Sequence, residues 1–128
     1  MGYRSDIRIR ITKGDFDNLK KEFAKYLTEH NISGNIFDDL DIYKEHEYTW
    51  DYYDYELNEW VDKTAKCVYF GWDDMKWYIE MEDLMDMICS LNAYAVTIIG
   101  ENDDDIRIEN ESFPSIALIR KFADECEE

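Results

Sequence analysis

Apolar and polar residues alternate near the start of the chain, as they do in a half-buried β-strand. Ile7, Ile9 and Ile11 are separated by arginines, so one face of this strand is apolar and the other is basic. The spacing then becomes that of a helix that ends near 31–34, and Asp15 is its expected N-cap. The apolar face of this helix consists of Phe16, Leu19, Phe23, Tyr26 and Leu27.

The same two periodicities recur in the second half of the chain and predict further strands and helices. In order, they are a strand at 66–72, a turn at 73–74, its hairpin partner at 75–78, a helix at 80–91, strands at 93–99 and 105–109, and a helix at 115–125.

Without the segment 36–62 and the last two elements, the predicted order is β-α-β-β-α-β. This order is typical of the ferredoxin-like arrangement, an antiparallel sheet with helices on one face. We therefore predict an α+β, ferredoxin-like fold with an insertion at 36–62 after the first helix and an extra C-terminal strand and helix. The length of 128 residues fits a single domain, 1–128.

The pattern leaves the structure of the insertion open. Its apolar residues between 36 and 43 and between 53 and 60 are spaced as on helical faces, whereas Tyr48, Trp50 and Tyr52 alternate as in a strand.

Charge narrows the range of partners. Asp and Glu number 31 against 14 Lys and Arg, which gives a formal net charge of −17. A phosphate backbone or an anionic membrane needs a basic surface, so we expect no direct contact with nucleic acid or membrane. The start, MGYRSDIRIR, lacks the apolar core of a signal peptide, and we expect a cytoplasmic protein. Self-repulsion favours a monomer or a weak homodimer.

Acidic and aromatic residues are concentrated in the insertion. Residues 37–62 hold ten acids, one lysine and eight of the twenty aromatic residues. Tyr and Trp anchor protein interfaces, and carboxylates around them attract an Arg- and Lys-rich partner. An alternative is that Trp50, Tyr53, Leu57 and Trp60 cover the open face of the sheet. The predicted partner-binding residues here are Tyr48, Trp50, Asp51, Tyr52, Asp54, Tyr55, Glu56 and Glu59.

A second acidic group lies in the predicted strand near 103–111. Alternate residues of a strand share one face and stand about 6.6 Å apart, close to the spacing of phosphates along a nucleic acid. The row could therefore occupy a basic channel, or it could be a solvated face that protects a sheet edge. The row contains Asp103, Asp105, Glu109 and Glu111.

Other chemistry is weakly indicated. Arg8, Arg10 and Arg107 are expected on one sheet face, where they either receive an anion or neutralise neighbouring acids. The three cysteines form no C-x-x-C pair, and the two histidines lack the spacing of metal ligands. We therefore predict no metal, no cofactor and no catalytic residues, and not an enzyme.

Three segments of the chain resemble a known family. The chain begins MGYRSD, residues 75–78 read MKWY, and residues 94–109 read YAVTIIGENDDDIRIE. They resemble a family of small acidic phage and prophage proteins that begin M-G-Y-R-S-[DE]-V and carry an xVKWY strand and the ending xxIGEDxDDIExE. The insertion at 36–62, Arg107 and the final helix depart from the family pattern.

The resemblance implies a phage accessory protein acting in the bacterial cytoplasm, and several such proteins counter bacterial defences. Together with the charge, it predicts an acidic inhibitor, most simply an anti-CRISPR protein. Such a protein would block a basic nucleic-acid-binding defence protein stoichiometrically, by occlusion or nucleic-acid mimicry. The alternatives are a small enzyme or nucleotide-binding module acting on a defence signal molecule, and a phage structural accessory protein.

Overall fold

The structure of the protein is a computed structural model, which describes residues 4–76, 79–100, 106–114, 116, 118–119 and 121–122. The elements are β1 (Arg4–Thr12), α1 (Lys13–Glu29), the 3-10 turn η1 (Ile36–Asp39), β2 (Ile42–Asp54), β3 (Glu59–Lys76), α2 (Ile79–Cys89), β4 (Tyr94–Gly100), β5 (Ile106–Glu111), β6 (Leu118–Ile119) and β7 (Lys121–Phe122).

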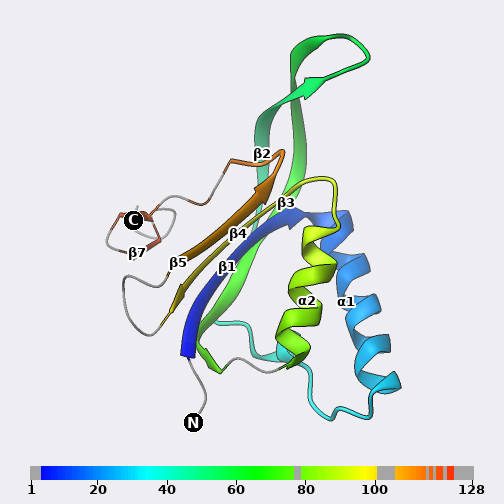
Figure 1. Ribbon diagram of the computed structural model, residues 1–128, viewed down its shortest axis with the longest axis vertical. Helices are drawn as coiled ribbons and strands as arrows, with labels where there is room; N and C mark the ends of the chain where they lie inside the picture. The colour runs from blue at the N-terminus through cyan, green and yellow to red at the C-terminus, as the bar shows by residue number, and fades with distance from the viewer. Residues whose placement is uncertain are drawn as a thin grey trace.

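A five-stranded antiparallel sheet of order β2-β3-β1-β4-β5 forms the centre of the molecule. Both α1 and α2 lie across one face of it (Figure 1). The α+β class is therefore confirmed. The ferredoxin-like topology is not confirmed, because the strand order differs from the predicted one: the hairpin partner of β3 is β2, from the predicted insertion, rather than residues 75–78.

The turn predicted at 73–74 is a bulge within one long strand. The register of β1 against β3 jumps between Ser5↔Met75 and Ile7↔Trp72, so β3 carries the extra residue. The carboxylates of Asp41 and Asp6 accept the backbone N–H groups of Asp73 (2.7 Å) and Asp74 (2.8 Å). These hydrogen bonds satisfy the backbone N–H groups that cannot pair with β1 at the bulge, so the strand continues.

The segment 36–62 adopts the strand alternative, preceded by η1. β2 pairs with β3 without interruption from Ile42↔Gly71 to Asp54↔Glu59. β1 pairs with β3 only as far as Thr12↔Cys67, so residues 47–66 pair with each other alone. This projecting hairpin, residues 47–66, extends well beyond the rest of the sheet (Figure 1).

Each face of the sheet has its own buried core. The alternation in β1 sends Ile7 and Ile9 toward the helices, where Phe23 and Leu84 are buried with them. On the other face, Trp50 belongs to a smaller core. The remaining members of this second core are Cys67, Tyr69, Ala93, Ala95, Phe113 and Ile116.

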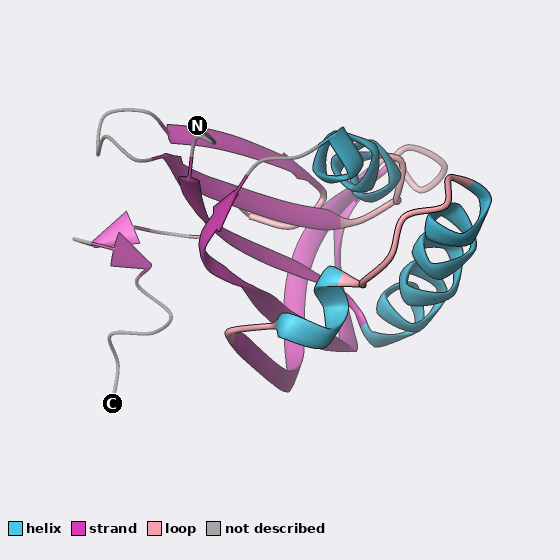
Figure 2. Cartoon of the chain, turned by 90° about the horizontal axis from the view of Figure 1, so that it is seen from below, coloured by secondary structure: helices cyan, strands magenta, loops and turns pink. Residues whose placement is uncertain are grey.

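Two predictions about helices need correction. The N-cap of α1 is Thr12 rather than Asp15, whose backbone N–H donates to Thr12 Oγ1 at 3.2 Å. Residues 118–119 and 121–122 of the predicted final helix form the antiparallel pair β6–β7, and the others, apart from Ile116, lie outside the described residues. Short apolar runs fit either periodicity, which explains the second error. Figure 2 places β6 and β7 on the side of the sheet away from the helices.

Among the described residues, no helix is both long and apolar enough to cross a membrane.

Candidate functional site

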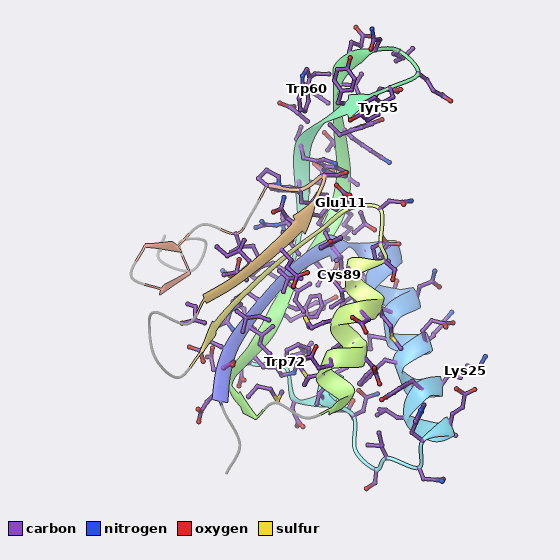
Figure 3. All side chains as sticks on the ribbon, viewed as in Figure 1. Lys25, Tyr55, Trp60, Trp72, Cys89 and Glu111 are labelled. Carbon is purple, nitrogen blue, oxygen red and sulfur yellow. The ribbon has the colours of Figure 1, made fainter. Side chains whose placement is uncertain are left out.

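The two edge strands of the sheet contribute to one pocket at the end where the hairpin projects. The pocket has a volume of about 300 Å³ and lies between the outer part of β2, the start of β3 and the end of β5. Figure 3 shows Tyr55 and Trp60 on the projecting hairpin and Glu111 near its base. The residues that line this hairpin pocket are Asp51, Tyr52, Tyr53, Tyr55, Trp60, Glu111 and Ser112.

Phe113 ties the end of β5 to the base of the hairpin. Its side chain is fully buried and packs edge-on against Trp50, with ring centroids 4.5 Å apart, and against Tyr48 at 5.3 Å. Asn110 Nδ2 donates to the carbonyl oxygen of Phe113 at 2.8 Å, which fixes the chain after β5. The wall formed by Glu111 is therefore held against the wall formed by the hairpin.

Three aromatic rings make the outer wall of the pocket. The ring of Tyr53 lies edge-on to Tyr55 (4.8 Å) and to Trp60 (5.6 Å), and its hydroxyl donates to Asn58 Oδ1 at 2.6 Å. Tyr55 is 85% exposed and Trp60 69% exposed. Large exposed rings that lie together are typical of a binding surface, whereas single exposed rings are common.

The hairpin turn is closed by its own polar groups. Asp54 Oδ1 accepts the backbone N–H groups of Glu56 (2.9 Å) and Leu57 (3.2 Å), and Asn58 adopts a positive φ of 57°. Asp and Asn are the residues that favour such a turn. The turn brings Trp60 directly opposite Tyr53 in the register.

Two carboxylates face each other on the hairpin. Asp51 stands directly opposite Asp62 across β2 and β3, and like charges at such a position destabilise a sheet. A hydrogen bond to the Asp62 carboxyl and the repulsion between the two groups raise the pKa of Asp51. Glu111 adds another carboxylate to the pocket wall. A cation bound here would relieve this repulsion.

The eight predicted partner-binding residues of the insertion divide into three groups. Asp51, Tyr52 and Tyr55 line the hairpin pocket. Tyr48 and Trp50 form part of the fold, since Trp50 is only 4% exposed and Tyr48 stacks against it with centroids 6.1 Å apart. The others lie at the end of the hairpin outside the pocket lining, and they are Asp54, Glu56 and Glu59. Of the residues expected to cover the open face of the sheet, Trp50 is buried, whereas Leu57 and Trp60 are exposed. The partner-binding role of the residues in the pocket stays a prediction.

The structure describes two residues of the predicted acidic row along 103–111, and both belong to β5. Asp103 and Asp105 lie outside the described residues. Glu109 is half-buried and accepts a hydrogen bond from Cys89 Sγ of α2 at 3.3 Å, whereas Glu111 is exposed and lines the pocket.

The buried arginines serve the fold. Arg8 is 2% exposed; it pairs with the carboxylate of Asp73 at 2.8 Å and donates to the carbonyl oxygens of Ile7 and Trp72. Arg8 therefore neutralises a neighbouring acid, which is one of the two roles expected for it. Arg107 pairs with Ile98 in the register of β4 and β5, and its side chain lies outside the described residues.

Arg10 lies on the face of the sheet opposite the helices, between aromatic side chains. Its guanidinium lies over the rings of Tyr48 (4.5 Å) and Tyr69 (5.2 Å), and its Nε donates to His46 Nε2 at 3.3 Å. Cys67 is buried in the same core, where burial raises the pKa of its thiol to about 11. Over the part of the chain that the structure describes, no group of three or more His, Cys, Asp and Glu residues is placed to hold a metal ion.

Sequence reasoning missed Tyr53, Trp60 and Ser112 as site residues. The useful signal was the turn chemistry of Asp54 and Asn58, which would have set the hairpin register and paired Tyr53 with Trp60. No local signal indicates that Ser112 approaches the hairpin, because that contact depends on the curvature of the whole sheet.

Comparison with known proteins gives little. No protein-family model matches the chain. A search of curated proteins finds no relative. Among solved structures, the chain is similar to a phage SAM lyase in complex with S-methyl-5'-thioadenosine, with 12% identity and a TM-score of 0.39 over 90% of this chain and 95% of that chain.

The comparison corrects the predicted function. The similar structure is that of a lyase, which is an enzyme, and this finding contradicts the predicted anti-CRISPR inhibitor acting by occlusion or mimicry. At this TM-score the similarity carries no argument about the substrate or reaction of the present chain. The resemblance to phage accessory proteins stays a prediction.

Proposed function

We propose that the protein binds an organic cation in the hairpin pocket. The observation that carries the proposal is the lining of that pocket: four aromatic side chains and two carboxylates converge on a cavity of about 300 Å³. This volume lies at the lower end of the range typical of small-molecule sites.

The aromatic wall supplies attraction that does not depend on a single ion pair. A cation over the face of Trp or Tyr gains about 0.5–2 kcal/mol, and quaternary ammonium groups are bound in this way by clusters of aromatic rings. Tyr53 packs edge-on against both Tyr55 and Trp60, so the three rings lie together beside the pocket.

The carboxylates supply the charge. Asp51 faces Asp62 across the hairpin, which raises the pKa of Asp51, and a cation beside it would favour its ionised form. The net charge of −17 adds a general attraction for cations, which concentrates them near the surface.

The pocket chemistry favours a diffuse organic cation over a metal ion. Hard metal ions such as Mg²⁺ and Ca²⁺ need a shell of oxygen ligands, whereas this pocket is largely aromatic. Quaternary ammonium, sulfonium and guanidinium groups are weakly hydrated and suit rings flanked by carboxylates.

Choline and its neutral carbon analogue 3,3-dimethylbutan-1-ol test this proposal as a matched pair, since they differ in one central atom and in charge. We expect calorimetry to show at least about tenfold tighter binding of choline, equivalent to roughly 1.4 kcal/mol. Equal binding of choline and the alcohol would overturn the proposal.

Variants locate the site. Trp60→Ala and Asp51→Asn should each weaken choline binding several-fold, because one removes a ring face and the other a charge. Glu59→Gln is the matched control: it removes a carboxylate on the same hairpin that does not line the pocket. A loss in Glu59→Gln as large as in Asp51→Asn would mean that the general field attracts choline, not the pocket.

A further inference from the structure

β2 has a long, regular outer edge. It stands at the end of the sheet order, and its thirteen residues pair continuously with β3 on the inner side. No strand among the described residues pairs with its outer side. The strand contains no proline and its register shows no bulge, although these are two of the devices that protect long edges. Such an edge accepts an added strand.

The negative charge along the edge of β2 favours an added strand that is basic. β2 carries Glu45, Glu47, Asp51 and Asp54 against one lysine. A second copy of β2 would place carboxylates beside carboxylates, and this disfavours self-pairing. Glu45 is already bound to Lys66 at 3.3 Å, whereas Glu47 is exposed on the same face two residues along. A strand with basic residues at alternate positions complements this edge.

The hairpin pocket lies along the same edge. Asp51, Tyr52 and Tyr53 are consecutive in a strand, so their side chains alternate between its two faces, yet all three line the pocket. The outer part of β2 therefore borders the pocket along consecutive residues. A segment paired with the earlier part of β2 and extended along the strand would approach the pocket, within reach of a long side chain.

We infer that the outer edge of β2 pairs with an extended, basic segment of a partner protein, and that one arginine of this segment is the cation in the hairpin pocket. The inference rests on the proposed function, because it names the source of the bound cation. It also gives the basic partner expected from the sequence a definite conformation, that of a β-strand.

The probe is a short peptide that alternates arginine and threonine, compared with free arginine. We expect the peptide to bind at least about tenfold more tightly than arginine and to slow amide hydrogen exchange within residues 42–54. Two versions carry N-methyl groups on alternate backbone amides, one on the arginines and one on the threonines. Strand pairing requires that at least one version loses binding. Undiminished binding of both would show attraction by charge alone and overturn the inference.

Charge reversal at two exposed positions gives a second test. Glu47→Lys lies on the edge outside the pocket lining, and Glu29→Lys, the matched control, changes the net charge equally at the end of α1. We expect Glu47→Lys to weaken peptide binding about tenfold and Glu29→Lys less than about twofold. Glu47→Gln, a milder change, should weaken the peptide several-fold if the reversal disturbs the fold.

Choline separates this inference from the proposed function. If Glu47→Lys weakens the peptide and leaves choline binding unchanged, the edge and the pocket act as separate parts of one site, as inferred. If choline binds and the peptide gives no protection in residues 42–54, the inference fails and the proposed function stands. If the peptide protects these residues and Trp60→Ala leaves its affinity unchanged, the side-chain cation is not in the pocket, and the inference fails.

Discussion

Replacing Phe113 with alanine tests whether this side chain holds the pocket wall at the end of β5 against the hairpin. Phe113 is fully buried, and truncating a buried phenylalanine to alanine costs about 3–5 kcal/mol. Its two edge-on contacts, with Trp50 and Tyr48, are lost together. The unfolding entropy of a chain of 128 residues is roughly 0.27 kcal/mol/K, so this cost lowers the midpoint by roughly 11–19 °C.

The assay is thermal unfolding of Phe113→Ala followed by circular dichroism, together with choline titration at low temperature. Tyr55→Ala is the control, because a ring that is 85% exposed should change the free energy of unfolding by less than about 0.5 kcal/mol. Phe113→Ala should also weaken choline binding, because the end of β5 would move away from the hairpin and take Glu111 and Ser112 out of the pocket wall. A midpoint drop of less than about 4 °C, or an equal drop in Tyr55→Ala, would refute the reasoning.

Three further predictions concern the sheet and its titrating groups. Gly71→Ala should destabilise the protein by about 3 kcal/mol in urea titrations, because a Cβ there would lie 1.9 Å from the carbonyl oxygen of Ile7; a loss below about 1 kcal/mol would contradict the close approach of β1 and β3. The pKa of Asp51 is raised above 3.8, so the folded state holds this proton more tightly and the free energy of unfolding falls as pH rises through the window above 3.8; Asp51→Asn should lose this component and be more stable at neutral pH, and identical pH profiles would count against it. Cys67, with a thiol pKa of about 11, should resist iodoacetamide at pH 8 in the native protein and react in urea, as peptide mass spectrometry can show; rapid native labelling would contradict its burial.

Local pattern accounts for much of the fold. The alternation in β1 and the helical spacing after it predicted both elements, because one face of each is buried in the same core. The return strand after β4 was also predicted, and it forms β5. The turn predicted at 73–74 was wrong. Carboxylates far away in the sequence accept the backbone N–H groups there, so the strand continues through a bulge.

The candidate site was only partly predictable. The aromatic and acidic composition of residues 37–62 marked the right segment, and Asp51, Tyr52 and Tyr55 were named from it. The division into buried and exposed rings was not predictable, because Trp50 is buried by Phe113, a residue far along the chain. Pockets between distant strands depend on sheet curvature, which periodicity does not encode.

The account is tested most directly by the indole N–H signal of Trp60 in an NMR titration with choline. We predict that this signal shifts saturably, that the signal of Trp72 does not move because its indole N–H is bound to the carbonyl oxygen of Ile36 at 2.8 Å, and that 3,3-dimethylbutan-1-ol leaves both in place. An unchanged Trp60 signal with choline, or the same shift with the neutral alcohol, would contradict cation binding in the hairpin pocket.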